Sequence, residues 1–360
     1  MNILIFTRYS TLGASSRLRS LQYLPWFEEA GIKCVLSPLI DDKTLWTFYQ
    51  TGKYSPFHLI RAYWRRIKQL LNKKSFDLIW IEKEALPWLP TWFERNLLGK
   101  TPYVLDYDDA IFHNYDQHTF PVVRYLLGQR IDQLMSEAAL ITAGNAYLAQ
   151  RAIKAGARNV EIIPTVIDLE RYPLKTTTIT DNDIPRIVWI GSPHTLKYLK
   201  LIEKPLATLS QKFTFKLRII NSINLELAGV DVEFVPWTET TEVASLQDCD
   251  IGIMPLVDSH WERGKCGYKL IQYMACSLPV VASPVGVNTE IVRDENGYLA
   301  TTDEEWIEEL GLLLSDKSLR CKMGSSGRKR VEEEFCTQQI APKLIHSLKQ
   351  VKGSFDSCVE

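Results

Sequence analysis

The sequence lacks a cysteine pattern, an excess of either charge and a long apolar run. Its seven cysteines are scattered and include no C-x-x-C, which argues against a disulfide framework or a zinc site and favours a reducing cytoplasm. Lys and Arg total 42 against 43 Asp and Glu, so no nucleic-acid partner is expected. No apolar run approaches the ~18–20 residues of a membrane span. The opening MNILIFT predicts a buried strand and not a signal peptide.

Short apolar runs alternate with longer amphipathic ones, which is typical of an α/β protein. In the first half, strands are predicted at 2–7, 33–37, 77–82, 103–106, 139–143 and 160–163. In the second half, they are predicted at 186–190, 215–220, 232–235, 250–254 and 279–282, followed by helices at about 303–315, 319–335 and 338–350. Residues 171–185 are rich in threonine, with proline near both ends, and predict a linker between two domains.

A loop of small residues follows the first strand and leads into a helix. Ser15 or Ser16 is a good N-cap there, and Gly13 lies in the loop. Arg17 and Arg19 fall in the first helical turn, where the helix dipole disfavours cations. Two arginines at that position fit a bound anion, although solvated arginines without a role remain an alternative.

Three carboxylates, Asp106, Asp108 and Asp109, follow a strand in the first half. Strand ends of this kind are where α/β proteins bind ligands. Asp108 and Asp109 are interpreted as groups that hold sugar hydroxyls. A divalent metal on Asp106 and Asp108, or carboxylates that only cap the loop, are the alternatives.

Two further loops come after strands of the second half. Gly191 and Ser192 lead into a helix start that contains Lys197, which could reach a phosphate. Residues 261–283 contain a glycine-bearing loop that opens an apolar helix, and its backbone N–H groups could bind a diphosphate. Its candidate donor-binding residues are Glu262, Arg263, Lys265, Gly267, Tyr268, Lys269 and Gln272.

The run YMACSLPVVAS at 273–283 resembles the E-A-M-A-C-G-x-P-V-V-A-S run of the family-4 retaining glycosyltransferases, which have the GT-B fold. Residues 162–172, IIPTVIDLERY, resemble that family's V-I-P-N-G-V-D-x-x-x-F. Residues 287–292 and 296–299 resemble its G-x-x-E-I-V and N-G-x-L. The resemblance spans most of the chain in the same order.

Four of the positions at which the chain departs from the family concern its site residues. The two glutamates of the family's E-x7-E motif fall on Gly264 and Gln272. In the family, the second of these glutamates binds the ribose. The phosphate-binding arginine falls on Ser192, while the accompanying lysine falls on Lys197. The family's first-domain histidine, which approaches the donor sugar, falls on Asp108.

The resemblance implies two Rossmann-like doubly wound domains that face each other across a cleft. The expected boundaries are 1–170 for the acceptor-side domain, 171–185 for the linker and 186–337 for the nucleotide-sugar domain, with a helix at about 338–360 packed back on the first domain. The implied activity is retaining transfer of a hexose-like sugar from a nucleotide-diphosphate sugar to a glycan or lipid-linked acceptor, without a cofactor or metal. Catalytic roles are expected for Asp108, Lys197, Lys265 and Lys269, and acceptor-side roles for Gly13, Ser15, Arg17, Arg19 and Asp109.

Three other functions remain open from the residues. The missing glutamate and arginine fit a non-catalytic nucleotide- or sugar-binding protein. Asp106 and Asp108 fit a metal-dependent GT-A transferase. A sugar-nucleotide epimerase of the same fold would need acid–base groups that the sequence does not place.

Residues 53–74 contain seven Lys or Arg and no Asp or Glu. Ile60, Tyr63, Trp64, Ile67, Leu70 and Leu71 recur there at helical spacing, beside Arg61, Arg65 and Lys68. A core-facing helix with a solvated basic side is one interpretation. The other is an interfacial helix on anionic lipid, which places the protein in the cytoplasm at the inner face of the membrane.

Overall fold

The structure is a computed structural model that describes residues 1–174, 184–221 and 223–359. The chain forms two compact units. Unit 1 contains Met1–Thr165, the short segment Gly264–Cys266 and the chain from Ile340 onward. Unit 2 contains the described residues of Val166–Arg263 and Gly267–Gln339. Nine residues of the predicted linker, 175–183, lie outside the described residues.

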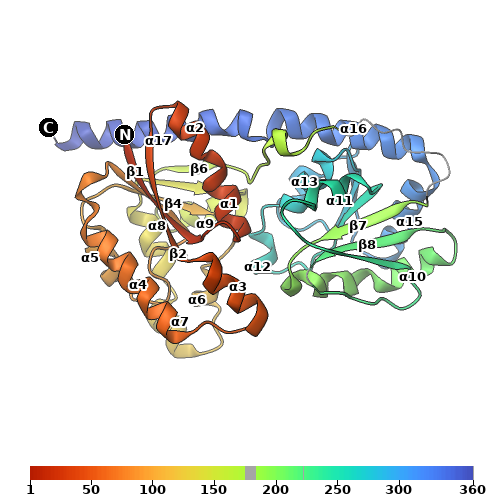
Figure 1. Cartoon of the computed structure of the whole chain (residues 1–360), viewed down its shortest axis with the longest axis horizontal. Coiled ribbons are helices and arrows are strands. Elements are labelled where there is room, and N and C mark those ends of the chain that lie inside the picture. Colours follow the sequence, from red (N-terminus) through yellow and green to blue (C-terminus); the bar gives the residue numbers. More distant parts are fainter. Residues whose placement is uncertain (175–183, 222, 360) are drawn as a thin grey trace. The chain divides into compact units, whose positions relative to one another are not determined.

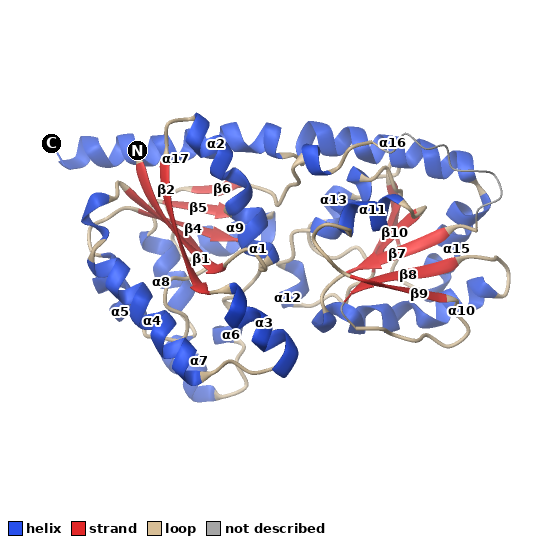
Figure 2. Cartoon of the chain, in the orientation of Figure 1, coloured by secondary structure: helices blue, strands red, loops and turns tan. Residues whose placement is uncertain are grey.

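Each unit is built on a parallel six-stranded sheet with helices around it (Figures 1 and 2). In unit 1 the strand order is β2-β1-β3-β4-β5-β6. Its strands are β1 (Asn2–Tyr9), β2 (Lys33–Ile40), β3 (Leu78–Glu82), β4 (Tyr103–Tyr107), β5 (Leu140–Ala143) and β6 (Val160–Ile162). Its helices are α1 (Ala14–Arg19), α2 (Leu24–Glu29), α3 (Asp42–Thr51), α4 (Pro56–Leu71), α5 (Thr91–Leu98), α6 (His113–Asp116), α7 (Pro121–Leu127), α8 (Arg130–Glu137) and α9 (Ala146–Lys154).

In unit 2 the strand order is β12-β11-β10-β7-β8-β9. Its strands are β7 (Arg186–Ile190), β8 (Lys216–Asn221), β9 (Val232–Pro236), β10 (Ile251–Met254), β11 (Val280–Ala282) and β12 (Gly297–Leu299). Its helices are α10 (Glu203–Ser210), α11 (Glu242–Gln247), α12 (His260–Arg263), α13 (Tyr268–Ala275), α14 (Asn288–Ile291), α15 (Asp303–Ser315) and α16 (Lys317–Glu334). The last helix, α17 (Thr337–Val359), begins in unit 2 and continues in unit 1.

The central strands are largely apolar because helices cover both faces of each sheet. Every residue of β3, β4, β5, β10 and β11 is buried. Trp80 in unit 1 and Trp189 in unit 2 are among the largest fully buried side chains. The predicted α/β class and doubly wound sheets are therefore confirmed.

All eleven predicted strands are present, and the predicted helices at 303–315, 319–335 and 338–350 correspond to α15, α16 and a longer α17. The prediction missed β12, a strand of three residues at the sheet edge. From Ile340 onward, α17 contacts unit 1, where Ser347 donates to Glu161 and Lys352 pairs with Asp77. Among the described residues, no helix has both the length and the apolar character that a bilayer crossing requires.

Close packing of α16 against the end of α13 depends on Gly324. A β-carbon at this position would lie 1.9 Å from the carbonyl oxygen of Ser277. We expect Gly324→Ala to lower the free energy of unfolding by about 1–3 kcal/mol, the usual cost of overpacking. Gly353 in α17 is the control, because nothing lies within 4 Å of its β-carbon position. Urea unfolding should show Gly353→Ala to be no less stable than the parent, and equal losses in both variants would contradict this packing.

Candidate functional site

Both sheets have a point at which the strand order reverses, and α/β proteins bind ligands beyond the carboxyl ends of the strands there. In unit 1 this point lies between β1 and β3, and in unit 2 between β7 and β10. Most of the predicted site residues follow these strands or their neighbour β4. The topology therefore groups them into one set at the strand ends of each sheet.

In unit 1, the ammonium group of Lys83 lies at the centre of the first set. It is 2.9 Å from Oδ1 of Asp108 and 3.5 Å from Oδ2 of Asp109, and it donates to Oγ of Ser15 at 3.1 Å. Ser15, Asp108 and Asp109 were predicted from the sequence, and the structure brings them together. Lys83 was missed because no motif contains it, although a charged residue directly after a buried strand is a usable signal.

The carboxyl groups around Lys83 differ in environment. Burial alone would raise the pKa of Asp108, but Lys83, Ser15 and Arg19 outweigh it and lower the pKa below its ordinary value. Burial raises the pKa of Asp109, and the negative charge of Asp108 raises it further. Lys83 lowers this pKa but does not outweigh the other two effects. Burial also raises the pKa of Glu82 to about 7. Environments that push neighbouring pKa values apart are typical of functional sites.

Arg19 is not available to bind an anion, so the prediction of an acceptor-side role for it is wrong. It is 1% exposed, and its Nε and Nη2 donate to the two carboxylate oxygens of Asp106 at 2.9 and 2.6 Å. Its Nη1 donates to the carbonyl of Ile163 at 2.7 Å. Thr142 also donates to Asp106, which leaves that carboxylate unsuited to the metal site considered as an alternative.

The other two candidates after β1 have local partners. Arg17 is half-buried and donates from Nη1 to the carbonyl of Thr11 at 2.9 Å. The prediction of Ser15 or Ser16 as the N-cap is wrong, because Gly13 is the N-cap of α1. A β-carbon on Gly13 would lie 2.3 Å from Cβ of Tyr9. Gly13 is therefore explained by packing, and the acceptor roles of both residues stay predictions.

The segment Gly264–Cys266 packs against the loops after β4 and β5 in unit 1. A β-carbon on Gly264 would lie 2.5 Å from Cβ and 2.7 Å from the backbone nitrogen of Ala110. No side chain fits there, which explains why the first glutamate of the family motif is absent. Nζ of Lys265 lies 4.0 Å from Oδ1 of Asp109, and Cys266 donates to the carbonyl of Asp108.

In unit 2, the loop after β7 lies beside α13. A β-carbon on Gly191 would lie 2.7 Å from Nζ of Lys269 and 2.7 Å from Oγ1 of Thr195, so the absence of a side chain leaves space beside a cation. Nζ of Lys269 lies 4.2 Å from the centre of the Trp189 ring. Ser192 and Lys197 are exposed in the 3₁₀ helix region that follows. This geometry brings Gly191 and Lys269 together, as a diphosphate site requires.

Two predicted donor-binding residues are bound within unit 2 instead. Glu262 is 5% exposed, and its two carboxylate oxygens accept hydrogen bonds from Tyr198 and Ser259. Arg263 is exposed and pairs through Nε and Nη2 with Asp258. Direct contact of Glu262 with a ligand is contradicted by its burial, whereas the role of Arg263 stays a prediction.

Gln272 belongs to a buried polar network. Its Nε2 donates to Oε1 of Glu242 at 2.8 Å and to the hydroxyl of Tyr172 at 3.0 Å, and the Trp237 indole donates to Oε2 of Glu242 at 2.6 Å. Both amide hydrogens are thus used, so donation from Gln272 to a ribose hydroxyl is not available. A glutamate at 272 would face the carboxylate of Glu242, which explains the second departure from the family motif.

The N-terminus of α13 requires glycine at its cap. Gly267 has a φ of 64°, and a β-carbon there would lie 2.3 Å from Cδ1 of Ile291. Tyr268 and Lys269 then form the first turn, so their backbone N–H groups begin the helix. This is the arrangement that favours anions at a helix start.

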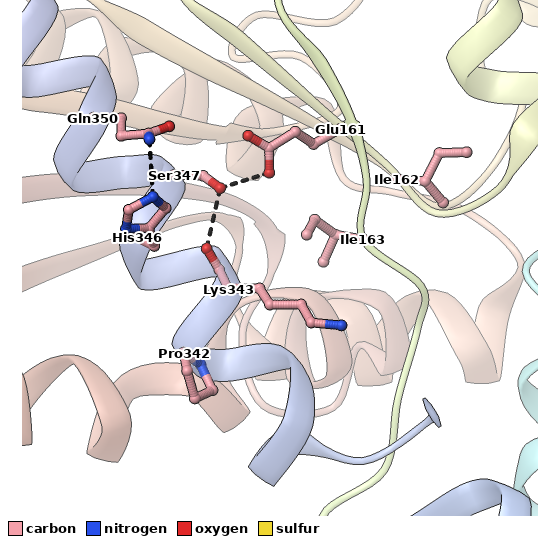
Figure 3. Close-up of a pocket in the computed structure, with 8 residues that line it drawn as sticks. All are labelled: Glu161, Ile162, Ile163, Pro342, Lys343, His346, Ser347 and Gln350. Atoms are coloured by element: carbon pink, nitrogen blue, oxygen red, sulfur yellow. Dashed lines mark hydrogen bonds between the residues drawn. The ribbon is translucent and has the colours of Figure 1, made fainter. Parts of the chain in front are cut away.

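A pocket of about 570 Å³ lies elsewhere in unit 1, between β6 and α17 (Figure 3). It contains none of the predicted site residues. Its polar side chains bond one another, as Ser347 donates to Glu161 and Gln350 pairs with His346. We therefore place the candidate site at the two strand-order reversals and not in this pocket.

Residues 184–316 match the family model described as Glycosyl transferases group 1. The capsular polysaccharide biosynthesis glycosyltransferase CapM of Staphylococcus aureus is 26% identical over 153 residues. That match spans 40% of this chain and 40% of CapM.

Two solved structures are similar along nearly the whole chain. Sucrose-phosphate synthase from Thermosynechococcus elongatus has a TM-score of 0.72 at 15% identity and covers 98% of this chain and 100% of its own. HepE from Anabaena, in complex with UDP and glucose, has a TM-score of 0.72 at 15% identity and covers 97% and 100%. The fold of these neighbours excludes the GT-A alternative. The chain therefore has the two-domain Rossmann-like GT-B fold, with a glycosyltransferase group 1 region at residues 184–316.

Proposed function

We propose that this protein is a retaining glycosyltransferase of the family-4 type, which transfers a sugar from a nucleotide-diphosphate sugar to a glycan or lipid-linked acceptor. The observation that carries the proposal is the convergence of Gly191, Lys269 and the start of α13 at the strand-order reversal of unit 2. The group 1 match over residues 184–316 supports it. The retaining outcome rests on the resemblance of residues 273–283 to the family-4 run.

The geometry of unit 2 suits stabilisation of a leaving diphosphate. As the bond between the anomeric carbon and the diphosphate oxygen breaks, its electron pair leaves with the diphosphate. Lys269 and the first N–H groups of α13 supply positive charge that needs no reorganisation during the reaction. The acceptor oxygen forms the new bond to the anomeric carbon on the same face, and the proton of the acceptor hydroxyl passes to the departing diphosphate. In this proposal fixed groups of the chain stabilise the leaving diphosphate, and no cofactor or metal ion takes part.

The complexes of HepE with UDP and UDP-glucose make UDP-glucose the first donor to test, and CapM makes a glycan the first acceptor class. A thermal-shift screen against UDP-, GDP-, ADP- and CMP-sugars should select one nucleotide. A donor at 100 times its Kd raises the free energy of unfolding by about 2.7 kcal/mol. Transfer of labelled sugar to octyl glucoside, and the anomeric configuration of the product by NMR, then test the reaction.

A non-catalytic binding protein is the second candidate, since Gly264 has no room for the family's glutamate. Both candidates predict nucleotide binding, but only the enzyme releases nucleoside diphosphate from its donor. Donor that stays intact during long incubation, with and without acceptor, would favour the binding protein.

Helix α4 supports the proposal of a peripheral membrane contact. Ala62, Arg66 and Leu70 face the core, while Phe57, Ile60, Trp64 and Leu71 are 62–71% exposed. The outer face is therefore an apolar stripe, and Figure 1 shows α4 at the outer edge of unit 1. The sequence interpretation is corrected at three positions, because Leu70 and the partly buried Tyr63 and Ile67 pack on the core and leave the stripe.

Exposed basic residues flank this stripe. Arg61, Arg65 and Lys68 are exposed, whereas Arg66 is buried and donates to the carbonyls of Thr7 and Ser37. Basic side chains beside exposed aromatic residues match an anionic lipid surface. A further apolar group on α7 includes Tyr125 at 89% exposed.

We expect Lys269→Ala to weaken UDP binding by roughly 10- to 150-fold, because one charge-assisted phosphate bond contributes about 1.5–3 kcal/mol. Isothermal titration with UDP measures the effect. Lys204→Ala in α10 is the matched control, since Lys204 is exposed on another helix, and it should bind UDP like the parent. Unchanged affinity in Lys269→Ala would contradict the diphosphate assignment.

We expect Gln272→Glu to lower the free energy of unfolding at pH 7 by about 1–3 kcal/mol, because Glu242 would lose its buried donor. The loss should shrink as the pH falls, since protonation of one carboxyl restores a donor. The exchange Gln272→Glu with Glu242→Gln keeps one amide and one carboxylate and should recover most of the stability in urea unfolding. A double variant no better than the single one would refute the pairing.

We expect binding to vesicles with anionic lipid to fall roughly 30-fold in Arg61→Gln/Lys68→Gln, at about 1 kcal/mol for each basic residue. Co-sedimentation at low salt measures it. Lys322→Gln/Lys329→Gln in α16 removes the same charge from another exposed surface and should bind like the parent. Binding that ignores lipid charge, or an absence of binding at low salt, would leave a soluble acceptor as the better proposal.

A further inference from the structure

Lys83 has an unusual backbone conformation directly after β3. Its φ is 65°, and only two other non-glycine residues among those described, Trp88 and Ser277, have a positive φ. The N–H of Glu84 donates to the carbonyl of Glu82 at 2.8 Å, so the chain turns over three residues with Lys83 at the centre. Turns of this kind with a positive φ are rare and strained, and such strain gathers at functional sites.

The turn brings the Lys83 ammonium to groups from other elements. Ser15 comes from α1, and Asp108 and Asp109 follow β4. The backbone N–H of Lys83 also donates to the carbonyl of Asp106 at 2.8 Å, which attaches the turn to β4. Lys83 is thus held at both its backbone and its side chain, and it is itself only 9% exposed.

The two aspartates beside Lys83 differ in access to solvent. The side chain of Asp108 is 11% exposed and that of Asp109 is 29% exposed. Asp109 directs Oδ2 to Lys83 at 3.5 Å, while its Oδ1 lies 4.0 Å from Lys265. Asp109 is therefore a partly exposed carboxylate whose two oxygens face two different lysines.

We propose that Lys83 is a positioning residue, which holds Asp109 so that its partly exposed carboxylate accepts a hydrogen bond from the acceptor hydroxyl and orients it for attack. This inference rests on the proposed function. Asp109 touches the substrate and is the catalytic residue, while Lys83 acts through it. The proton still leaves with the diphosphate, so Asp109 orients the hydroxyl and its own charge does not change during transfer.

The pH dependence follows from the groups around Asp109. Lys83 and Lys265 favour its carboxylate, whereas burial and Asp108 oppose it. Glu82, Ser15, Arg19 and the thiol of Cys266 also lie around the two aspartates and Lys83. Removal of the Lys83 charge raises the pKa of Asp109, so the carboxylate is lost at a higher pH and the acid limb of the activity moves upward.

The test uses the full chain with Lys83→Gly, which removes the ammonium while glycine accepts the positive φ without strain. Lys83→Asn is a second variant, because asparagine also tolerates this conformation. With octyl glucoside and the donor selected by thermal shift, the acceptor kcat/KM should fall about tenfold or more at pH 7. Its acid limb should move up by about 1–3 pH units, the usual effect of an opposite charge at this distance.

Lys154→Met in α9 is the control for removal of an exposed lysine in unit 1, and its pH profile should match the parent. The donor Kd should stay unchanged in all variants.

A parent-like pH profile in both Lys83 variants, even with a lowered melting temperature, would show a structural role only and overturn the proposal. A parent that transfers no sugar would overturn the proposed function and this inference with it. Failure of the proposed function is thus distinguished from failure of the positioning role, in which the parent transfers sugar and the Lys83 variants keep its pH profile. Carbon-13 NMR titration of the aspartates should show the raised pKa of Asp109 without turnover, and an unchanged value would refute the positioning role.

Discussion

The buried ion pair between Arg19 and Asp106 is the interaction on which the strand ends of unit 1 depend. Arg19 at the end of α1 forms two bonds with Asp106 in β4 and one with the carbonyl of Ile163, just after β6. The hydroxyl of Thr142 from β5 donates a further hydrogen bond to the carboxylate of Asp106. Desolvation of two charges is costly, and a buried pair is tolerated only when its geometry is good and its remaining groups are hydrogen-bonded. Here both conditions hold, so the first helix is fixed over the same strand ends from which Asp108 and Asp109 emerge.

Most of the framework could be predicted from the sequence because buried parallel strands appear as short apolar runs, and all eleven predicted strands exist. The sequence did not predict β12, because an edge strand of three residues is too short to show a periodic pattern. Arg19 shows a different limit. The prediction placed it in a first helical turn, but Arg19 lies in the last turn of α1, and the sequence does not show that its partner is a carboxylate 87 residues away. Lys83 was missed for the same reason, since its three partners are distant in the chain.

The positions at which the chain differs from the motifs that it resembles have local physical reasons. Gly264 sits against Ala110, and Gln272 faces Glu242, so a glutamate is excluded from the first position by space and from the second by charge. Ser277 stands where the family run has glycine and keeps a φ of 58°. A side chain at this φ costs of order 1–3 kcal/mol and persists where the surroundings determine the backbone. The carbonyl of Ser277 packs against Gly324 of α16, which supplies such a surrounding.

The two strand-order reversals present opposite chemistry, and each matches one half of the proposed reaction. Unit 2 offers the Lys269 cation and the start of α13, both of which favour a developing negative charge, and Gly191 leaves space beside them. Unit 1 offers carboxylates arranged around one buried ammonium, which suits a neutral hydroxyl that donates a hydrogen bond and needs no neutralisation. Burial drives a carboxylate at such a strand end toward protonation, as it does for Glu82 and Asp109, and the charge of Lys83 opposes this effect. Lys83 therefore performs for the acceptor side what the helix start performs for the diphosphate: it keeps the ionised form of its partner stable in a place with little water.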